Sequence, residues 1–237
     1  MSDYTPSSWG RPSGDGFPPP SANRPRVRIV TDSASDILPS HAQAIGAYVV
    51  PSWIVMDGAR YRDGIDISAS EFYVRLPRLR TPPYTEPASP QDFVQVYQAA
   101  FTQGATAIIS IHVSSRLSKI VEHATMARNY LAPTPIDVID SQQAGIGMWP
   151  AVIRAAQLAR MGASPWAIHE ETVSVLARTR LYALVESLEQ LRRSGRIGRA
   201  REFFGTLLDA HPIITVEGGE VTPVDTVRTR ARGLLRL

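Results

Sequence analysis

The stretch Val27-Arg28-Ile29-Val30-Thr31-Asp32-Ser33 decides the fold, because a short β-rich run ends there in polar residues. The same layout occurs twice more. Residues 106–111 form an apolar run followed closely by Ser114-Ser115, and residues 136–139 form another, followed by Asp140-Ser141. Continuous apolar runs of this length are typical of strands in a parallel sheet that is buried on both faces. We therefore expect three central strands whose carboxyl ends all carry polar side chains.

Helical patterns separate these strands. Ser89-Pro90-Gln91-Asp92 predicts a helix start, because it joins a capping serine, a proline in the first turn and an acidic residue three positions after the cap. A further helix is expected with Val121, Ala124, Arg128 and Leu131 at helical spacing, and another over about 149–161. Residues 47–55, which Pro51 interrupts, are expected to form an edge strand. Alternating strands and helices predict a parallel sheet with right-handed crossovers.

The second half of the chain has a less regular pattern. It is expected to begin with a helix from Ser164-Pro165 to about residue 178 and a strand over 181–185. A short helix follows, capped by a Ser187 and Gln190 box and ended by Gly195. The last expected elements are a helix over 200–208 and strands over 213–216 and 221–224 that flank Gly218-Gly219. Two adjacent glycines between two short apolar runs predict a tight β-hairpin.

These patterns predict an α/β fold with two lobes. We expect an N-terminal lobe with a parallel sheet over residues 27–150 and a smaller α/β lobe over residues 151–237. Residues 1–26 hold six of the 19 prolines with several glycines and serines and no apolar period. A segment of that composition buries too little surface to offset its ordering entropy, so we expect a disordered tail there.

Composition excludes several classes of protein. The chain has 237 residues, of which 43% are hydrophobic, and it has no cysteine, which excludes disulfides and thiolate metal sites. No apolar run approaches the roughly 18 residues of a membrane span, and the N-terminus lacks a signal-peptide layout, so a cytoplasmic location is expected. The net charge of +3 is too small to predict nucleic-acid binding. One arginine cluster stands out and predicts either a solvated helical face or a partner-docking face: Arg192, Arg193, Arg196, Arg199 and Arg201.

Hydroxyl side chains gather where the predicted strands end. In open α/β sheets ligands bind beyond the carboxyl ends of the strands, so Ser33, Ser114, Ser115 and Ser118 are candidates to hold a small polar or anionic group. Ser118 is the best of them, because a hydroxyl at a helix start lies beside free N–H groups and the positive end of the helix dipole. Helix capping alone is the competing explanation for each position.

Common catalytic motifs are absent from the sequence. There is no phosphate-binding G-x-x-x-x-G-K-[ST] loop and no G-x-S-x-G elbow. The five histidines show no metal-ligand spacing, so no metal site is expected. Asp32 and Asp36 are explained more simply by capping than by cation binding. His112 lies near Ser114 in sequence and would be the base of a serine hydrolase, although a histidine at a strand end is more often only hydrogen-bonded.

Short motifs in a fixed order along the chain carry a resemblance to a known family. They are Val30-Thr31-Asp32-Ser33, Asp36-Ile37-Leu38-Pro39, Val50-Pro51, Tyr61-Arg62-Asp63-Gly64, Thr85-Glu86-Pro87, Ser114-Ser115-Arg116-Leu117-Ser118, Asp140-Ser141, Gly195-Arg196-Ile197-Gly198, His211-Pro212-Ile213-Ile214 and Val227-Arg228. In this order and spacing they resemble the DegV family of fatty-acid-binding proteins, from about residue 27 to the C-terminus.

The resemblance implies a function and a set of site residues. It implies two α/β lobes with an acyl chain in a tunnel between them, and a kinase partner that phosphorylates the bound carboxylate. The family's carboxylate-binding threonine and serine correspond to Thr85 and Ser118, and the arginine near the head group corresponds to Arg196. This sequence departs from the family pattern at Lys119, where the family has glycine. It also ends at Leu237, where family members continue for several dozen residues, so the C-terminal lobe is expected to be truncated.

Together these observations predict a carrier of a single long-chain fatty acid that is not an enzyme and needs no cofactor. A serine-dependent acyl hydrolase using Ser118 or Ser114 with His112 is one alternative. A regulatory or interaction protein that has lost its ligand is the other.

Overall fold

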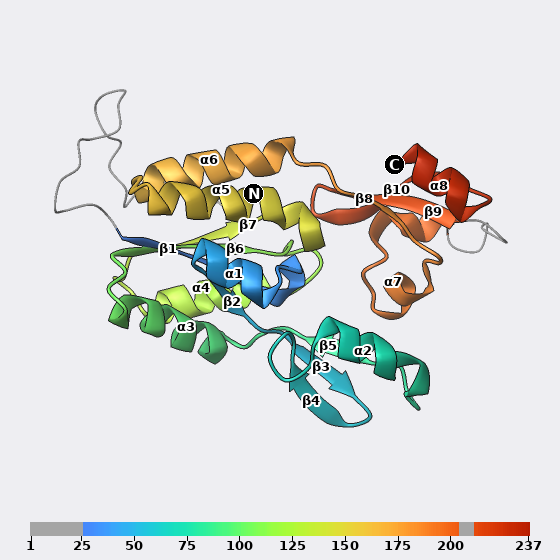
Figure 1. The fold of residues 1–237 in the computed structure, drawn as a ribbon, viewed down its shortest axis with the longest axis horizontal. Coiled ribbons are helices and arrows are strands. Elements are labelled where there is room, and N and C mark those ends of the chain that lie inside the picture. The colour runs from blue at the N-terminus through green and yellow to red at the C-terminus, as the bar shows by residue number, and fades with distance from the viewer. Residues whose placement is uncertain (1–25, 204–210) are drawn as a thin grey trace.

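A parallel four-stranded sheet forms the centre of the molecule (Figure 1). The computed structural model describes residues 26–203 and 211–237. The strand order is β2-β1-β6-β7, from β1 (Val27–Asp32), β2 (Ala47–Val50), β6 (Ala107–His112) and β7 (Ile136–Asp140). All three pairings are parallel. The predicted α/β fold with a parallel sheet is therefore confirmed.

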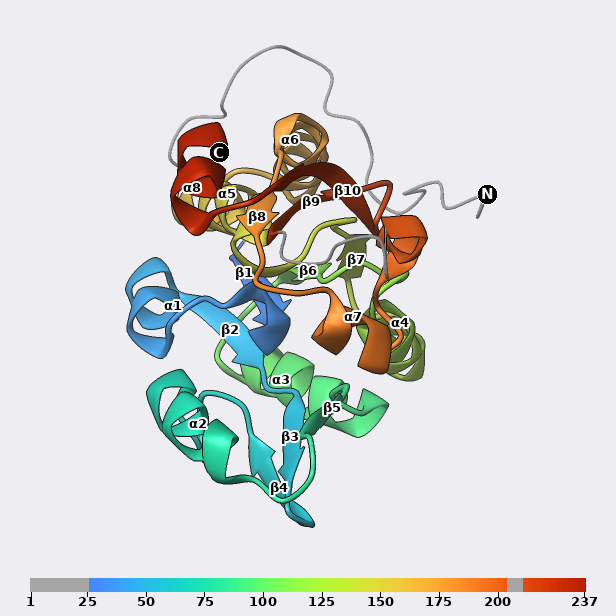
Figure 2. The same cartoon turned by 90° about the vertical axis from the view of Figure 1, so that its right-hand side faces the viewer.

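Helices cover both faces of this sheet (Figures 1 and 2). One face carries α1 (Pro39–Ile45), α5 (Trp149–Arg160) and α6 (Pro165–Arg178), and the other carries α3 (Pro90–Thr102) and α4 (Ile120–Tyr130). The predicted capping box opens α3, because Ser89 Oγ accepts from the Asp92 amide at 3.2 Å and Asp92 Oδ2 accepts from the Ser89 amide at 2.8 Å. Buried apolar residues between the two helical layers and the sheet form the main core.

Residues 47–55 form two strands in two different sheets, so the expectation of one interrupted edge strand is wrong. β2 does lie at the edge of the parallel sheet, but β3 (Trp53–Met56) belongs to a small antiparallel sheet of order β4-β3-β5. Pro51 lacks the N–H that a continued ladder needs, which explains the break. The remaining elements of this region are β4 (Ala59–Arg62), α2 (Ala69–Arg75), the 3₁₀ helix η2 (Leu76–Arg78) and β5 (Tyr84–Glu86).

A third sheet lies in the C-terminal part. β8 (Tyr182–Leu184), β9 (His211–Glu217) and β10 (Glu220–Val227) pair antiparallel in the order β10-β9-β8. The predicted hairpin is present: Gly218 and Gly219 both have positive φ, 57° and 83°, as a two-residue turn of this kind requires. The short helices here are α7 (Glu189–Arg193), η4 (Gly198–Phe203) and α8 (Arg230–Arg236).

Two predictions for this region need correction. The Ser187–Gln190 box does not form, because Leu188 is the capping residue of α7 and its side chain makes no cap. Part of the helix expected over 200–208 is the 3₁₀ helix η4, and residues 204–210 lie outside the described part of the chain. The predicted tail also lies outside it, except for Arg26.

The division into lobes at 27–150 and 151–237 stays a prediction, and we propose a later boundary. α5 packs on β1 and α6 packs on β6, so both helices share the core of the parallel sheet. A boundary after α6 leaves the β8–β10 sheet with its own small core around Leu188, Ile197 and Val221. Within residues 26–203 and 211–237, no helix has the length and apolar character that a membrane span requires.

Candidate ligand-binding cavity

A cavity of about 380 Å³ lies beyond the carboxyl ends of β1 and β6. β1 has β2 on one side and β6 on the other. The chain leaving β1 therefore continues to one edge of the sheet and the chain leaving β6 continues to the other, so the two loops diverge at this point. Such a switch point is the usual place for a ligand in an open α/β sheet. Here the small antiparallel sheet and the C-terminal sheet also contribute to the walls.

The walls divide into an apolar and a polar group. The apolar wall residues are Ala34, Pro87, Val113, Leu117, Ile120, Ala144, Leu181, Leu191, Ile214, Val216 and Val221. The polar and charged ones are Ser33, Asp36, Ser52, Asp63, Thr85, Glu86, Ser118 and Arg196. A mostly apolar cavity with a few convergent polar groups suits a molecule with a long apolar part and a polar end.

Four of the six predicted site residues line this one cavity. Thr85 comes from β5, Ser118 from the loop before α4, Arg196 from the loop after α7, and Ser33 from the end of β1. Ser114 and Ser115 do not line it. The fold thus brings together segments that lie more than 150 residues apart in sequence.

The hydroxyls of Thr85 and Ser118 have no hydrogen-bond partner among the described residues, which leaves them available to a ligand. The other three candidate hydroxyls are engaged. Ser33 Oγ accepts from the Ser52 amide at 3.0 Å, and Ser114 Oγ donates to the Gly219 carbonyl at 2.7 Å. Ser115 Oγ donates to Asp140 Oδ2 at 2.5 Å. Ser114 and Ser115 therefore stabilise loops, and neither hydroxyl caps α4, whose capping position is Lys119.

Arg196 is held in place by its backbone surroundings. Its Nε donates to the Leu117 carbonyl at 2.9 Å, one residue before Ser118. Gly198 follows with φ +52°, and a Cβ there would lie 2.6 Å from the Val221 carbonyl oxygen. Only glycine lets the backbone at residue 198 pack this closely against Val221 of β10. The loop that carries Arg196 is therefore held against β10.

Known proteins share this architecture. A family model described as "Uncharacterised protein, DegV family COG1307" matches residues 26–237. The chain belongs to the DegV family. A DegV domain-containing protein of Caldanaerobacter subterraneus subsp. tengcongensis is 35% identical over 209 residues, covering 88% of this chain and 74% of that protein.

Several solved structures resemble this fold closely. A Thermus thermophilus DegV family protein, described for its fatty acid binding, is 34% identical with a TM-score of 0.80, covering 87% of this chain and 73% of that one. DegV of Bacillus subtilis, a fatty acid binding protein, is 26% identical with a TM-score of 0.81, covering 89% and 75%. A stearic acid-binding protein of Eubacterium ventriosum is 25% identical with a TM-score of 0.78, covering 87% and 72%.

The side chains of three acidic residues, Asp36, Asp63 and Glu86, border the polar side of the cavity. Desolvation raises the pKa of Asp36, and the charges of Asp63 and Asp32 raise it further. Desolvation also raises the pKa of Asp63, although a hydrogen bond with Ser33 opposes that shift. Lys119, which the sequence places next to Ser118, is exposed and is not among the wall residues. Among the described wall residues, the cationic side chain is therefore that of Arg196.

The apolar walls were missed by sequence reasoning. Ile214, Val216 and Val221 belong to the C-terminal strands, and nothing in their residue types separates a cavity wall from an ordinary core. In the described residues, no three His, Asp or Glu side chains gather in a way that could hold a metal ion.

The structure does not assemble the hydrolase pair. His112 is fully buried, and its Nδ1 lies 2.9 Å from Asp32 Oδ2 while its Nε2 lies 2.6 Å from Ser110 Oγ. Both ring nitrogens therefore have partners other than Ser114 and Ser118. The Ser110–His112–Asp32 arrangement resembles a catalytic triad, but Ser110 is also fully buried and bonds to Tyr97.

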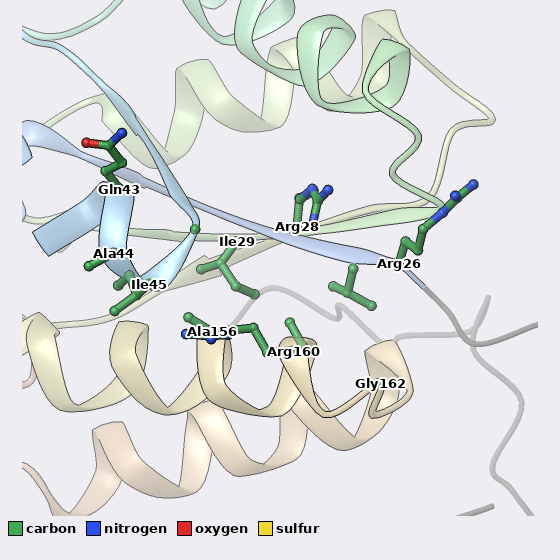
Figure 3. A pocket seen from close by; sticks show the side chains of 12 residues that line it. Arg26, Arg28, Ile29, Gln43, Ala44, Ile45, Ala156, Arg160 and Gly162 are labelled. Atoms are coloured by element: carbon green, nitrogen blue, oxygen red, sulfur yellow. The ribbon is translucent and has the colours of Figure 1, made fainter. Parts of the chain in front are cut away.

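A second cavity, of about 410 Å³, lies at the opposite end of the parallel sheet, between α1, β1 and α5 (Figure 3). Three arginines border it. In Figure 3, Arg28 of β1 and Arg26, just before β1, extend away from α5, which carries Arg160. The Arg26 guanidinium lies beside Gly104, 3.4 Å from where a Cβ would stand. Their charges do not converge, so the switch-point cavity is the stronger candidate for a ligand.

Proposed function

We propose that this DegV-family protein binds one long-chain fatty acid in the switch-point cavity and acts as a carrier rather than an enzyme. The carboxylate accepts hydrogen bonds from Thr85 and Ser118 near the charge of Arg196, and the acyl chain lies along the apolar walls. The observation that carries this proposal is that one cavity combines apolar walls with two hydroxyls that have no partner among the described residues. The fatty-acid-binding relatives support it.

The energetics suit such a ligand. Each buried methylene contributes about 0.8 kcal/mol, so the acyl chain supplies most of the affinity. Hydrogen bonds from hydroxyls to a carboxylate are charge-assisted, and they orient the head group. Arg196 adds an attractive charge without entering the apolar part, because its Nε is already bound to the Leu117 carbonyl.

The polar side of the cavity adjoins a wide surface groove, which supports presentation of the carboxylate to a partner. The groove has a volume of about 1020 Å³ and is lined by residues of α7 and of the segment formed by α2, η2 and β5. Thr85, Leu191 and Arg196 line both the groove and the cavity. A kinase that phosphorylates the carboxylate would reach it from this groove, and we place the carrier and its kinase partner in the cytoplasm.

Two measurements test the proposal. Calorimetric titration with palmitate and with oleate is expected to saturate at one ligand per chain. Adding the kinase component of a bacterial fatty acid kinase with ATP is then expected to give acyl phosphate only when the loaded carrier is present. Absence of saturable binding refutes the carrier function, whereas binding without acyl phosphate refutes only the kinase partner.

A further inference from the structure

A chain of four buried polar side chains begins beside the cavity and ends in the core. His112 Nδ1 donates to Asp32 Oδ2 at 2.9 Å, His112 Nε2 lies 2.6 Å from Ser110 Oγ, and Ser110 Oγ lies 2.9 Å from the Tyr97 hydroxyl. All four residues are fully buried. None of the four is among the proposed ligand contacts.

One assignment of protons satisfies every member of the chain. A carboxylate only accepts, so the geometry assigns a proton to His112 Nδ1, and Nε2 then accepts from Ser110. Ser110 in turn accepts from Tyr97, whose pKa is raised by burial, so that Tyr97 keeps its proton. The chain therefore has a direction, with Tyr97 as the terminal donor and Asp32 as the terminal acceptor.

Asp32 joins the two loops that form the inner part of the cavity. Its Oδ1 accepts from the Ala34 amide at 2.9 Å, and its Oδ2 accepts from the Val113 amide at 3.1 Å. Ala34 follows β1 and Val113 follows β6, and both residues line the cavity. Asp32 does not line it. Its carboxylate thus fixes the distance between the two loops without being part of the cavity wall.

We propose that Asp32 is a positioning residue for the ligand cavity and that the Nδ1–H of His112 keeps its carboxylate in the orientation that binds both amides. The effect on ligand affinity rests on the proposed fatty-acid binding. The effect on the two loops does not, since Asp32 acts on the backbone of Ala34 and Val113 whether or not a ligand is present.

Two substitutions of His112 separate this role from a general contribution to packing. The amide nitrogen of His112→Asn takes the place of Nδ1 and still donates to Asp32, whereas the amide of His112→Gln takes the place of Nε2 and reaches Ser110. Asparagine leaves the larger void, so a role in packing alone predicts that His112→Asn is the more damaging change. Tyr97→Phe is the control, because it removes the far end of the chain and leaves Asp32 bound.

Palmitate affinity and amide hydrogen exchange at Ala34 and Val113 are measured for each variant under conditions where it is folded. We expect His112→Asn and Tyr97→Phe to keep the Kd within about threefold of wild type. His112→Gln is expected to raise the Kd about tenfold and to speed exchange at both amides.

Equal losses in the two His112 variants, or a larger loss in His112→Asn, would overturn the positioning role. If the wild-type protein binds no palmitate, the proposed function fails, and the exchange rates still decide the role of Asp32. Unchanged exchange at both amides in His112→Gln refutes it in that case.

Discussion

The substitution Ser118→Ala removes one hydroxyl from the polar side of the cavity and leaves the rest of the wall unchanged. Ser118 is partly buried and its hydroxyl has no hydrogen-bond partner among the described residues. No hydrogen bond among the described residues is therefore broken, and the free energy of unfolding without ligand should change by less than about 0.5 kcal/mol. The whole effect is expected in ligand binding.

The size of that effect follows from the charge of the ligand. A hydrogen bond to a charged group contributes about 1.5–3 kcal/mol, which corresponds to a rise in Kd of about 10- to 150-fold. The methyl ester of the same fatty acid keeps the acyl chain but carries no charge. A neutral hydrogen bond contributes about 0.5–1.5 kcal/mol, so the same substitution should weaken ester binding by roughly tenfold or less.

The assay is a competition titration of palmitate and methyl palmitate against a fluorescent fatty acid, with wild type and Ser118→Ala. Ser115→Ala is the matched control, because that exposed hydroxyl bonds to Asp140 and does not line the cavity. Equal weakening of acid and ester in Ser118→Ala would refute the assigned head-group contact. An effect of Ser115→Ala as large as that of Ser118→Ala would refute it as well.

Three further substitutions test the local physics of the fold and the site. Gly198→Ala should lower the free energy of unfolding by about 1–3 kcal/mol in urea denaturation, because it forces a Cβ against the Val221 carbonyl at positive φ; no loss would mean that the loop does not need glycine. The hydrogen bond with Asp137 raises the pKa of His169, so the stability that His169 contributes is full below about pH 6.5 and declines as the pH rises through the raised pKa. His169→Ala should therefore cost more stability at pH 5.5 than at pH 9, and the reverse order would contradict this account. Ser89→Ala should cost about 1 kcal/mol by opening the capping box of α3, whereas an unchanged unfolding curve would show that the box contributes nothing.

Features that depend on neighbouring residues could be predicted from the sequence. The Ser89 capping box, the Gly218-Gly219 hairpin and the polar ends of β1, β6 and β7 all follow from local preferences. The gathering of hydroxyls at the strand ends also followed from the pattern, since parallel strands end at one edge of a sheet.

Features that depend on distant partners could not be predicted. Pro51 was recognised as a break, but the pairing of Trp53 with Arg62 and Glu86 in a separate sheet depends on residues that only the fold brings together. Likewise, Ser114 bonds to Gly219, which lies 105 residues away in sequence. Local reasoning could not tell this engaged hydroxyl from the unengaged one of Ser118.

The switch-point cavity is proposed to hold one fatty acid. Native mass spectrometry of the purified protein, followed by denaturing extraction of whatever was bound, tests it most directly. We predict one long-chain fatty acid per chain, or uptake of one equivalent of palmitate or oleate by protein purified without ligand. A protein that is empty and takes up neither fatty acid would contradict the claim.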